Sequence, residues 1–281
     1  MSELNTLVVW EIIERALRED IGSGDVTTDA ICEPDQMGRA VIRTKEPCVV
    51  AGVPIAQMVF ETLDFQLRFT SRVRDGDRLA AGQIIAELDG RLRTILTGER
   101  IALNFLQRLS GIATATARYV EAVRDFSVKI LDTRKTAPGL KIFDKYAVRV
   151  GGGQNHRMGL YDGVLIKTNH IRAAGGIAKA IERARRSAPT TLRIEVEVKN
   201  LKELQEALDA GADIIMLDNM SLEEIRQAVK IAHGRALLEA SGGVNLENVR
   251  EIAATGVDFI SVGALTHSVK AIDMHLEVLA P

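Results

Sequence analysis

The sequence predicts an α/β protein of two domains, a small antiparallel sheet with helices followed by an incomplete parallel α/β barrel. Two observations support this prediction. Short runs that alternate polar and apolar residues lie between residues 38 and 96 and are separated by turns such as Asp75-Gly76. From about Ser127 onward, short β-rich runs lead into segments with helical periodicity, which is typical of βα units around a parallel sheet.

The expected elements follow in chain order. An amphipathic helix is predicted over residues 7–19, because apolar residues recur there at helical spacing, and strands of the small sheet are predicted at 39–43 and 65–69. Barrel strands are predicted at 128–132, 163–167, 192–198, 213–217, 236–240 and 257–262, with helices over 140–149, 173–187, 200–209, 221–232 and 245–254.

Polar, charged or glycine residues follow nearly every predicted barrel strand. In an α/β barrel the carboxyl ends of the strands converge on one face, whereas an open doubly wound sheet would spread them along a crevice. Since separate positions could then ring a single pocket, the barrel is favoured, and it should be incomplete because only six units are visible. These strand-end residues are Arg134, Lys135, Lys167, Glu197, Asp218, Ser241, Gly242, Gly243, Gly263 and Ala264.

The composition excludes several classes of protein. The chain has 281 residues, of which 46% are hydrophobic and 26% charged, values that are ordinary for globular proteins and unlike disordered or fibrous ones. Two cysteines without metal or disulfide spacing, no basic segment before an apolar run at the start and no long apolar stretch predict a soluble cytoplasmic protein.

Positive charge is concentrated in the segment from Thr133 to Arg172, where eight basic residues face only Asp144 and Asp162. In a chain whose formal net charge is only -2, this cluster predicts a focused pocket for a multiply anionic small molecule. A solvated basic face is the alternative, and nucleic acid is disfavoured because aromatic residues are sparse and the pI is near 6.3. The basic residues are Arg134, Lys135, Lys141, Lys145, Arg149, Arg157, Lys167 and Arg172.

Acidic residues occupy the next strands. Alternation within 194–198 places Glu195 and Glu197 on one face, directed into the barrel, where carboxylates need cations, a metal or ligand hydroxyls, or else form a structural ion-pair layer. Asp218 could share Mg²⁺ or a ribose diol with Glu197, and the alternative for Asp218-Asn219 is to cap the helix that begins near Ser221.

The last two strands are followed by Ser241-Gly242-Gly243 and Gly263-Ala264, where barrels often bind phosphate through backbone N–H groups. His156, beside Arg157, is expected to donate a hydrogen bond to an anionic substrate. For His267, a structural role and a role in the site are equally consistent with the sequence. No serine or cysteine nucleophile arrangement accompanies the histidines.

These motifs resemble the quinolinate phosphoribosyltransferase family of NAD biosynthesis over almost the whole chain. The resemblance rests on the motifs Glu19–Asp25, Gly98–Gly111, Thr133–His170, Glu195-Val-Glu197, Leu217-Asp-Asn219, Glu239–Gly243 and Gly263–Ser268. It implies an N-terminal α/β sandwich domain over 1–110, completed by 270–281, and an incomplete barrel over 111–269. It also implies conversion of quinolinate and phosphoribosyl pyrophosphate, with Mg²⁺, to nicotinate mononucleotide, pyrophosphate and CO₂.

The resemblance also implies roles for single residues. Arg134, His156, Arg157 and Lys167 would bind quinolinate, joined by Arg100 from a neighbouring subunit of a homodimer or hexamer. Lys135 would lie on the pyrophosphate side, and Lys135, Lys167, Glu197 and Asp218 are the expected catalytic residues. Glu197 and Asp218 would serve the ribose hydroxyls and, through the substrate, Mg²⁺. Ser241, Gly242, Gly243, Gly263 and Ala264 would face the 5′-phosphate.

One position departs from the family pattern, because Thr168 stands where the family usually has aspartate in K-D-N-H. A molybdenum-transport-associated paralogue with the same architecture is the closest alternative, although Asn155-His-Arg157 and Lys167 fit the quinolinate enzyme better. A non-catalytic phosphosugar-binding barrel is the alternative from another class.

Overall fold

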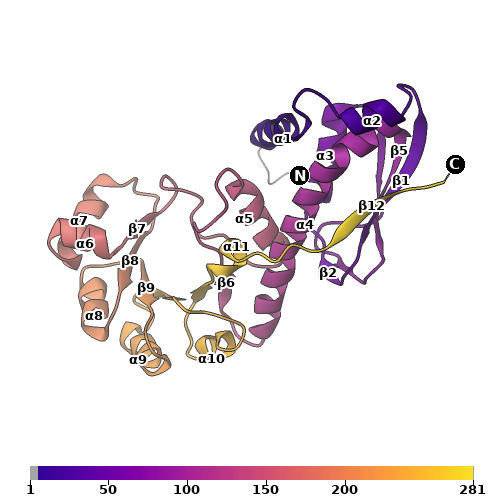
Figure 1. The fold of residues 1–281 in the computed structure, drawn as a ribbon. Coiled ribbons are helices and arrows are strands. Elements are labelled where there is room, and N and C mark those ends of the chain that lie inside the picture. Colours follow the sequence, from indigo (N-terminus) through magenta and orange to yellow (C-terminus); the bar gives the residue numbers. More distant parts are fainter. Residues whose placement is uncertain (1–5, 281) are drawn as a thin grey trace. The chain divides into compact units, whose positions relative to one another are not determined.

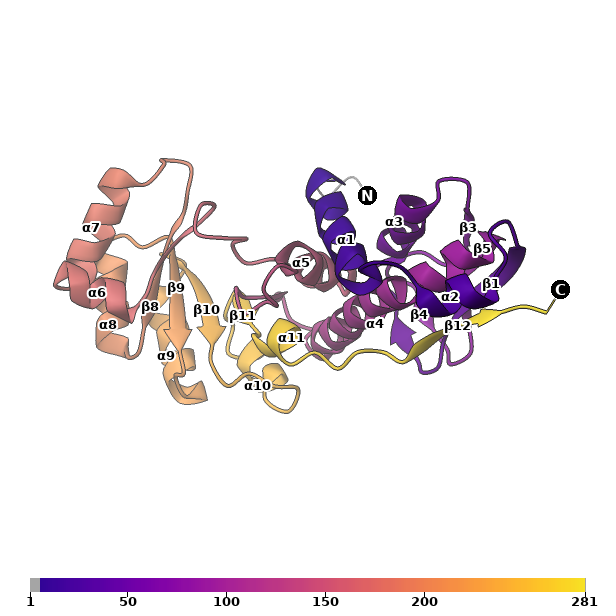
Figure 2. The same ribbon diagram turned by 45° about the horizontal axis from the view of Figure 1, so that its top comes forward.

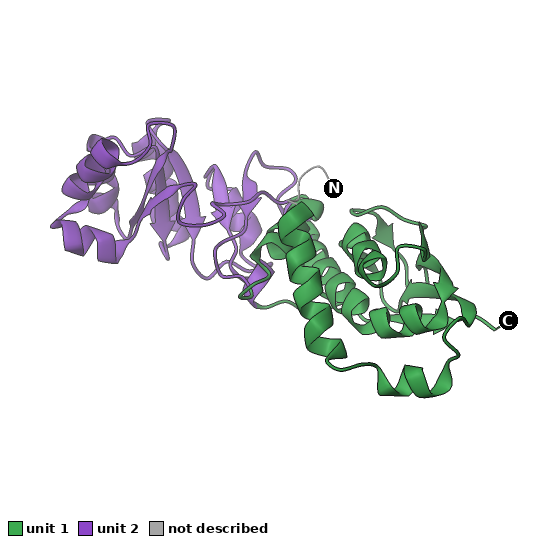
Figure 3. Cartoon of the chain, turned by 90° about the horizontal axis from the view of Figure 1, so that it is seen from above, with its two compact units in different colours: residues 1–117, 137–152, 268–281 green, residues 118–136, 153–267 purple. Residues whose placement is uncertain are grey.

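The computed structural model describes residues 6–280, which form two compact units (Figure 3). Unit 1 comprises residues up to 117, 137–152 and 268 onward, and unit 2 comprises 118–136 and 153–267. The contacts therefore group 137–152 with the N-terminal part of the chain, whereas the sequence suggested that this segment belongs to the barrel. Within residues 6–280, no helix combines the length and the apolar character needed to cross a membrane.

Unit 1 is built on an antiparallel sheet in the order β12-β1-β5-β3. Strand β12, from the C-terminal part of the chain, pairs with β1 and forms one edge of this sheet, with Ala40 opposite Val278. Its elements are α1 (Thr6–Ile21), α2 (Val26–Ile31), β1 (Met37–Thr44), β2 (Cys48–Val49), α3 (Val53–Leu63), β3 (Arg68–Ser71), β4 (Arg78–Leu79), β5 (Ile84–Arg91), α4 (Leu92–Ala122, continuing into unit 2), α5 (Lys141–Val150) and β12 (Met274–Val278).

The predicted strand at 65–69 begins only at Arg68. Asp64 explains the difference, because its carbonyl accepts from the Leu67 N–H and its side chain accepts from the Gln66 N–H, which holds residues 64–67 in a turn. The predicted strand at 39–43 is confirmed within β1.

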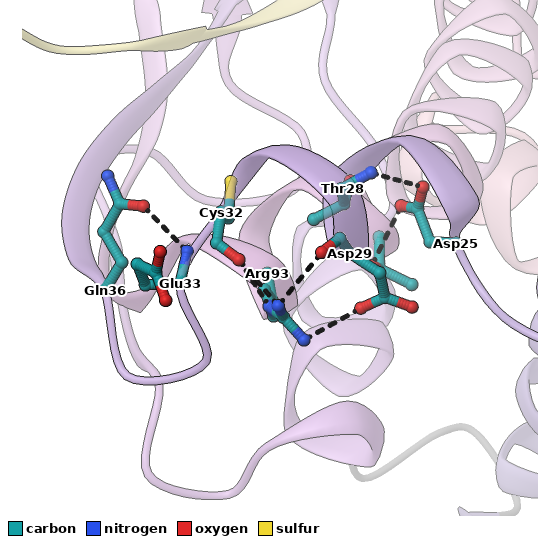
Figure 4. A network of polar contacts seen from close by, with 8 residues as sticks. Asp25, Thr28, Asp29, Cys32, Glu33, Gln36 and Arg93 are labelled. Atoms are coloured by element: carbon teal, nitrogen blue, oxygen red, sulfur yellow. Dashed lines mark hydrogen bonds and ion pairs between the residues drawn. The ribbon is translucent and has the colours of Figure 1, made fainter.

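The first turn of α2 is fastened to α4 by polar contacts (Figure 4). Asp25 caps α2 by accepting from the Thr28 N–H at 3.0 Å, and its other carboxylate oxygen accepts from the Thr97 hydroxyl of α4 at 3.1 Å. Arg93 of α4 donates to the Cys32 carbonyl at the end of α2 and to Asp29. Both ends of this short helix are thus tied to the same long helix.

Unit 2 contains a six-stranded parallel sheet in the order β6-β11-β10-β9-β8-β7. The first strand pairs with the last, whereas β6 and β7 do not pair among the described residues: the isolated bridge from Leu131 of β6 is to Gln154, which precedes β7. The expected incomplete barrel is therefore confirmed, with its opening between β6 and β7. The strands are β6 (Lys129–Leu131), β7 (Val164–Ile166), β8 (Ile194–Val198), β9 (Ile214–Asp218), β10 (Leu237–Ser241) and β11 (Phe259–Ser261).

The helices of unit 2 follow the strands and, as Figures 1 and 2 show for α7 and α8, cover the outer side of β8. The helix predicted over 173–187 is two helices, since Gly175 and Gly176 have φ of 81° and 135°, values that side chains disfavour. The helix predicted over 245–254 starts at Val249, because Asn245 accepts backbone N–H groups in a preceding turn. The helices are α6 (Thr168–Ala174), α7 (Ile177–Ser187), α8 (Leu201–Asp209), α9 (Leu222–Ala232), α10 (Val249–Ala253) and α11 (Ala264–His267).

Candidate active site

A cavity of about 560 Å³, here called the strand-end pocket, opens at the carboxyl ends of the six parallel strands of unit 2. It collects residues from every strand end, which is the arrangement that the barrel prediction requires. Its lining consists of Thr133, Arg134, Lys135, His156, Arg157, Leu165, Lys167, Glu197, Met216, Asp218, Asn219, Glu239, Ser241, Gly242, Gly243, Val244, Ser261, Gly263, Ala264 and His267.

The basic part of the strand-end pocket comes from the ends of β6 and β7 and from the segment between α5 and β7. Arg157 is half-buried, and one of its terminal nitrogens donates to the Gly163 carbonyl at 3.0 Å. Burial, and next the nearby positive charge of Arg134, lowers the pKa of Arg157 below its usual range. Within residues 6–280 its buried Nε has no hydrogen-bond partner, and the negative charges of Glu195 and Asp162 offset only part of the pKa decrease.

The middle of the predicted basic cluster lies elsewhere. Lys141, Lys145 and Arg149 belong to α5 in unit 1 and do not line the strand-end pocket. In α5 the buried Asp144 accepts two hydrogen bonds from Arg108, at 2.8 and 2.9 Å. The sequence segment thus divides, because Arg172 in the last turn of α6 also lies outside the pocket lining and only Arg134, Lys135, Arg157 and Lys167 of the cluster line it.

The acidic part of the pocket comes from the adjacent strands β8 and β9. Alternation along β8 directs both Glu195 and Glu197 inward as predicted, with Glu195 buried and Glu197 half-buried in the pocket. Glu197 accepts from the Thr168 hydroxyl at 2.6 Å, and Asp218 accepts from the Asn219 side-chain amide at 2.9 Å. The alternative that Asp218-Asn219 caps α9 is wrong, because Ser221 is the capping residue and accepts from the Glu224 N–H.

The glycine turn after β10 approaches Asn219 closely. A Cβ on Gly242 would lie 2.2 Å from Asn219 Oδ1, and its φ of 95° also favours glycine. Gly263 after β11 is confined by Lys135 and His267, since a Cβ there would lie 3.2 and 3.1 Å from their side chains. The pocket is therefore shaped by missing side chains on this side, where backbone N–H groups can approach a ligand.

His156 differs from its expected role as a donor to substrate. Its Nδ1 accepts the Arg157 N–H at 2.7 Å, and its Nε2 lies 2.9 Å from Glu195 and 3.5 Å from Glu239. The backbone N–H of His156 donates to the buried Asp132. Both ring nitrogens are thus engaged by the protein itself.

Of the predicted site residues, all but one line the strand-end pocket. The exception is Arg100, which lies on α4 in unit 1, where its side chain is 58% exposed and its nearest acidic partner is Glu99 at 3.9 Å. The sequence interpretation gave Glu239 no site role, although an acidic residue inside the apolar run Leu237-Leu-Glu-Ala was a signal for it. It also gave no site role to Thr133, Leu165, Met216, Asn219, Val244 and Ser261, and left His267 open.

Known proteins match this chain over nearly all its length. The chain is 45% identical over 275 residues to the probable nicotinate-nucleotide pyrophosphorylase [carboxylating] of Bacillus subtilis, covering 98% of this chain and 95% of the relative. It is 42% identical to the quinolinate phosphoribosyltransferase [decarboxylating] 2b, mitochondrial, of Nicotiana tabacum, covering 95% of this chain and 81% of that protein. The solved nicotinate-nucleotide pyrophosphorylase of Francisella tularensis has a TM-score of 0.94 at 46% identity, covering 98% of both chains.

Two family descriptions cover most of the sequence. Residues 25–110 match the quinolinate phosphoribosyl transferase N-terminal domain, and residues 112–277 match the C-terminal domain. Together with a parallel barrel whose strand ends gather separate basic and acidic groups, these matches establish that the chain belongs to the quinolinate phosphoribosyltransferase family.

Proposed function

We propose that the strand-end pocket joins quinolinate to phosphoribosyl pyrophosphate and releases nicotinate mononucleotide, pyrophosphate and CO₂, a step of NAD biosynthesis. One observation carries the proposal. A single cavity holds Arg134, Arg157 and Lys167 at the ends of some strands, and Glu197 and Asp218 at the ends of others. Such a cavity suits a reaction between a dianionic acid and a phosphorylated sugar.

The basic residues provide the quinolinate side. Arginine pairs with carboxylates through two parallel hydrogen bonds, and the half-buried Arg157 lacks an acceptor for its Nε among the described residues. The two carboxylates of quinolinate would relieve the repulsion between Arg134 and Arg157. The same residues bind nicotinate poorly, because its single carboxylate leaves part of this charge uncompensated.

Glu197 and Asp218 provide the ribose side. Loss of pyrophosphate from C1 of the sugar develops positive charge on the ribose ring, which a nearby carboxylate stabilises. The pyridine nitrogen bonds to C1 as the C1–O bond to pyrophosphate breaks. Because the nitrogen becomes positively charged, the bond from C2 to its carboxylate can break as CO₂, leaving the electron pair at C2 until a proton is added.

Mg²⁺ is the expected cofactor, and the residues present fit it. Glu197 and Asp218 offer carboxylate oxygens from neighbouring strand ends within one pocket, a set to which substrate oxygens can be added. The ion would supply charge neutralisation for the departing pyrophosphate. Lys135 and Lys167 lie on the same pocket and contribute further positive charge.

A homo-oligomer that shares active sites is also part of the proposal. Arg100 is exposed on unit 1, and the family resemblance assigns it to the pocket of a neighbouring subunit. The glycine turns after β10 and β11, with Ser241 and Ala264, are proposed to bind the 5′-phosphate through backbone N–H groups.

The test is an assay of nicotinate mononucleotide formation with quinolinate or nicotinate at fixed phosphoribosyl pyrophosphate and Mg²⁺. We expect turnover of quinolinate with a preference on the order of 10⁴-fold in kcat/KM over nicotinate. Equal use of the two acids would contradict the assigned pocket. Absence of product together with absence of quinolinate binding would refute the proposed function and favour a different ligand for the barrel.

A further inference from the structure

A buried cluster of His156, Glu195 and Glu239 adjoins the strand-end pocket. Glu195 comes from β8 and Glu239 from β10, with exposed fractions of 4% and 1%. His156 Nε2 lies 2.9 Å from Glu195 and 3.5 Å from Glu239, and one ligand-type atom of each residue lies within 4.8 Å of the others. The cluster therefore brings two carboxyl groups and one imidazole together out of water.

The histidine cannot balance two carboxylates. Its Nδ1 accepts a hydrogen bond from the Arg157 N–H at 2.7 Å, which leaves Nε2 to face the two carboxyl groups, and even a positively charged imidazole would balance only one of two carboxylates. Nε2 lies nearer to Glu195 than to Glu239. If both carboxyl groups were ionised, the cluster would therefore carry more negative charge than the histidine can neutralise.

A second observation concerns the carboxyl oxygens. Among the described residues, Glu195 Oε1 and Glu239 Oε1 are buried without a hydrogen-bond partner. A buried charged carboxylate with an unpaired oxygen is costly, and two of them in contact repel each other. Burial first, and then the charge of Glu195, raises the pKa of Glu239 to about 8.

The surroundings of Glu239 contain few other charges. Glu195 faces Glu239 from β8, and His156 faces it from the segment between α5 and β7. Arg157 interacts electrostatically with Glu195. On the neighbouring strands, β11 contributes the hydroxyl of Ser261 and β9 contributes Met216 opposite Glu239. His156 and Ser261 lower the pKa of Glu239, but by less than burial and Glu195 raise it.

We propose that Glu239 is a neutral carboxylic acid at neutral pH, that it donates its proton to Glu195, and that binding of a pyridine dicarboxylate requires this proton. The ligand named here rests on the proposed function. The shared proton leaves the cluster with a single negative charge. Ionised Glu239 would place a second negative charge on the pocket wall that receives a dianion, so Glu239 acts as a positioning and charge-setting residue.

The main experiment measures quinolinate binding by isothermal titration calorimetry with the full-length protein, without Mg²⁺, between about pH 6.5 and pH 9.5. Quinolinate has no group that titrates in this range. We expect a constant Kd up to about pH 7.5 and then a rise that approaches tenfold per pH unit, because one proton must be taken up before the ligand binds.

The decisive variant is Glu239→Gln, which keeps the shape and the donor of a neutral acid but cannot ionise. Its Kd should stay within about threefold of the unaltered protein at pH 7 and should not rise with pH. Glu182→Gln, the same change at an exposed position of α7, should keep the alkaline rise. An alkaline rise that persists in Glu239→Gln, or its absence from the unaltered protein, would overturn the proposal.

Two further measurements separate the alternatives. Infrared spectra of the unaltered protein should lose the absorption of a neutral carboxylic acid as the pH rises through about 8, a result that does not depend on the variant folding or on quinolinate binding. A spectrum without this change would overturn the proposal. A divalent ion held by the same three residues would instead make quinolinate binding sensitive to a chelator, and that outcome would also overturn it. Failure to bind quinolinate at every pH would refute the proposed function alone.

Discussion

Thr168 shows how one substitution within a family motif can be accommodated. It lies at the start of α6, and its hydroxyl donates to Glu197 Oε1 at 2.6 Å. The family usually has an acidic residue at this position, which cannot donate such a bond when ionised. Here the hydroxyl fixes the rotamer of Glu197, so part of the ribose-side geometry depends on a residue outside the set of expected catalytic groups.

Thr168→Val should therefore lower kcat at least about tenfold and leave the Kd for quinolinate unchanged, because a hydrogen bond to a charged group is worth about 1.5–3 kcal/mol. Steady-state kinetics and calorimetry would measure the two effects separately. Thr168→Ser retains the hydroxyl and serves as the control. If valine weakened quinolinate binding and spared turnover, the assignment of Glu197 to the ribose side would be wrong.

Gly242 offers a second test at the scale of single residues. Gly242→Ala would press a methyl group against Asn219, at 2.2 Å from its side-chain oxygen, in a backbone conformation with φ of 95°. We expect the KM for phosphoribosyl pyrophosphate to rise more than about tenfold, since the displaced turn faces the proposed phosphate side. Gly211→Ala, also at positive φ but with nothing within 4 Å and outside the pocket lining, controls for backbone strain alone.

Most of the pocket could be predicted because a parallel barrel places the residue after each strand on the same face. Glu239 was missed because it lies two residues before the end of β10, where sequence alone predicts only an inward direction. Its pairing with Glu195 depends on β9 lying between the two strands. The hydrogen bond of His156 Nδ1 likewise depends on the local path of the chain at Arg157, which no spacing rule supplies.

At the scale of elements, α2 is a short helix whose stability depends on its caps. Asp25→Ala should lower the free energy of unfolding of unit 1 by about 1 kcal/mol, because the Thr28 N–H and the Thr97 hydroxyl lose their acceptor. The pKa of Asp25 is lowered, mainly by hydrogen bonds from Thr28, so the difference from Ala should be full near neutral pH and should decrease progressively as the pH falls below about 4. Denaturant unfolding at several pH values checks this.

Asp25→Asn keeps a capping acceptor and serves as the control for the same experiment. The variant should retain most of the stability at neutral pH and show less dependence on acid. Equal loss in both variants would mean that the carboxylate acts through charge rather than through the cap.

The elements that the sequence predicted lie within a few residues of the observed ones, and these errors have local causes, whereas α3 and the long helix α4 were not predicted. The helix expected over 173–187 is broken by two glycines at positive φ, and the strand expected at 65–69 is shortened by the Asp64 turn. Periodicity reports which face of a segment is buried, but side-chain hydrogen bonds to the backbone decide where the segment begins. Such bonds are not visible in apolar spacing.

At the scale of the whole molecule, the chain assigns different tasks to its two units. Unit 2 carries the strand-end pocket, and unit 1 carries Arg100 and the middle of the basic segment. Sequence analysis predicted one basic cluster over residues 133–172, because charge density along a chain does not reveal which residues the fold separates. Only the burial of Asp144 against Arg108 within unit 1 shows that part of it is structural.

The proposed sharing of sites between subunits predicts complementation. Arg100→Ala and Lys167→Ala should each be nearly inactive, because each removes a cation from every site of a homodimer. A mixed dimer would contain one site with both changes and one with neither, by the symmetry of the pair. Mixing the two variants should therefore restore up to about half of normal activity per mixed dimer. A matched mixture of Arg134→Ala and Lys167→Ala, both in the pocket of one chain, should stay inactive. Recovery in that mixture would mean that these two residues do not serve the same site. Failure of the first pair despite demonstrated exchange would show that Arg100 acts within its own subunit or not at all.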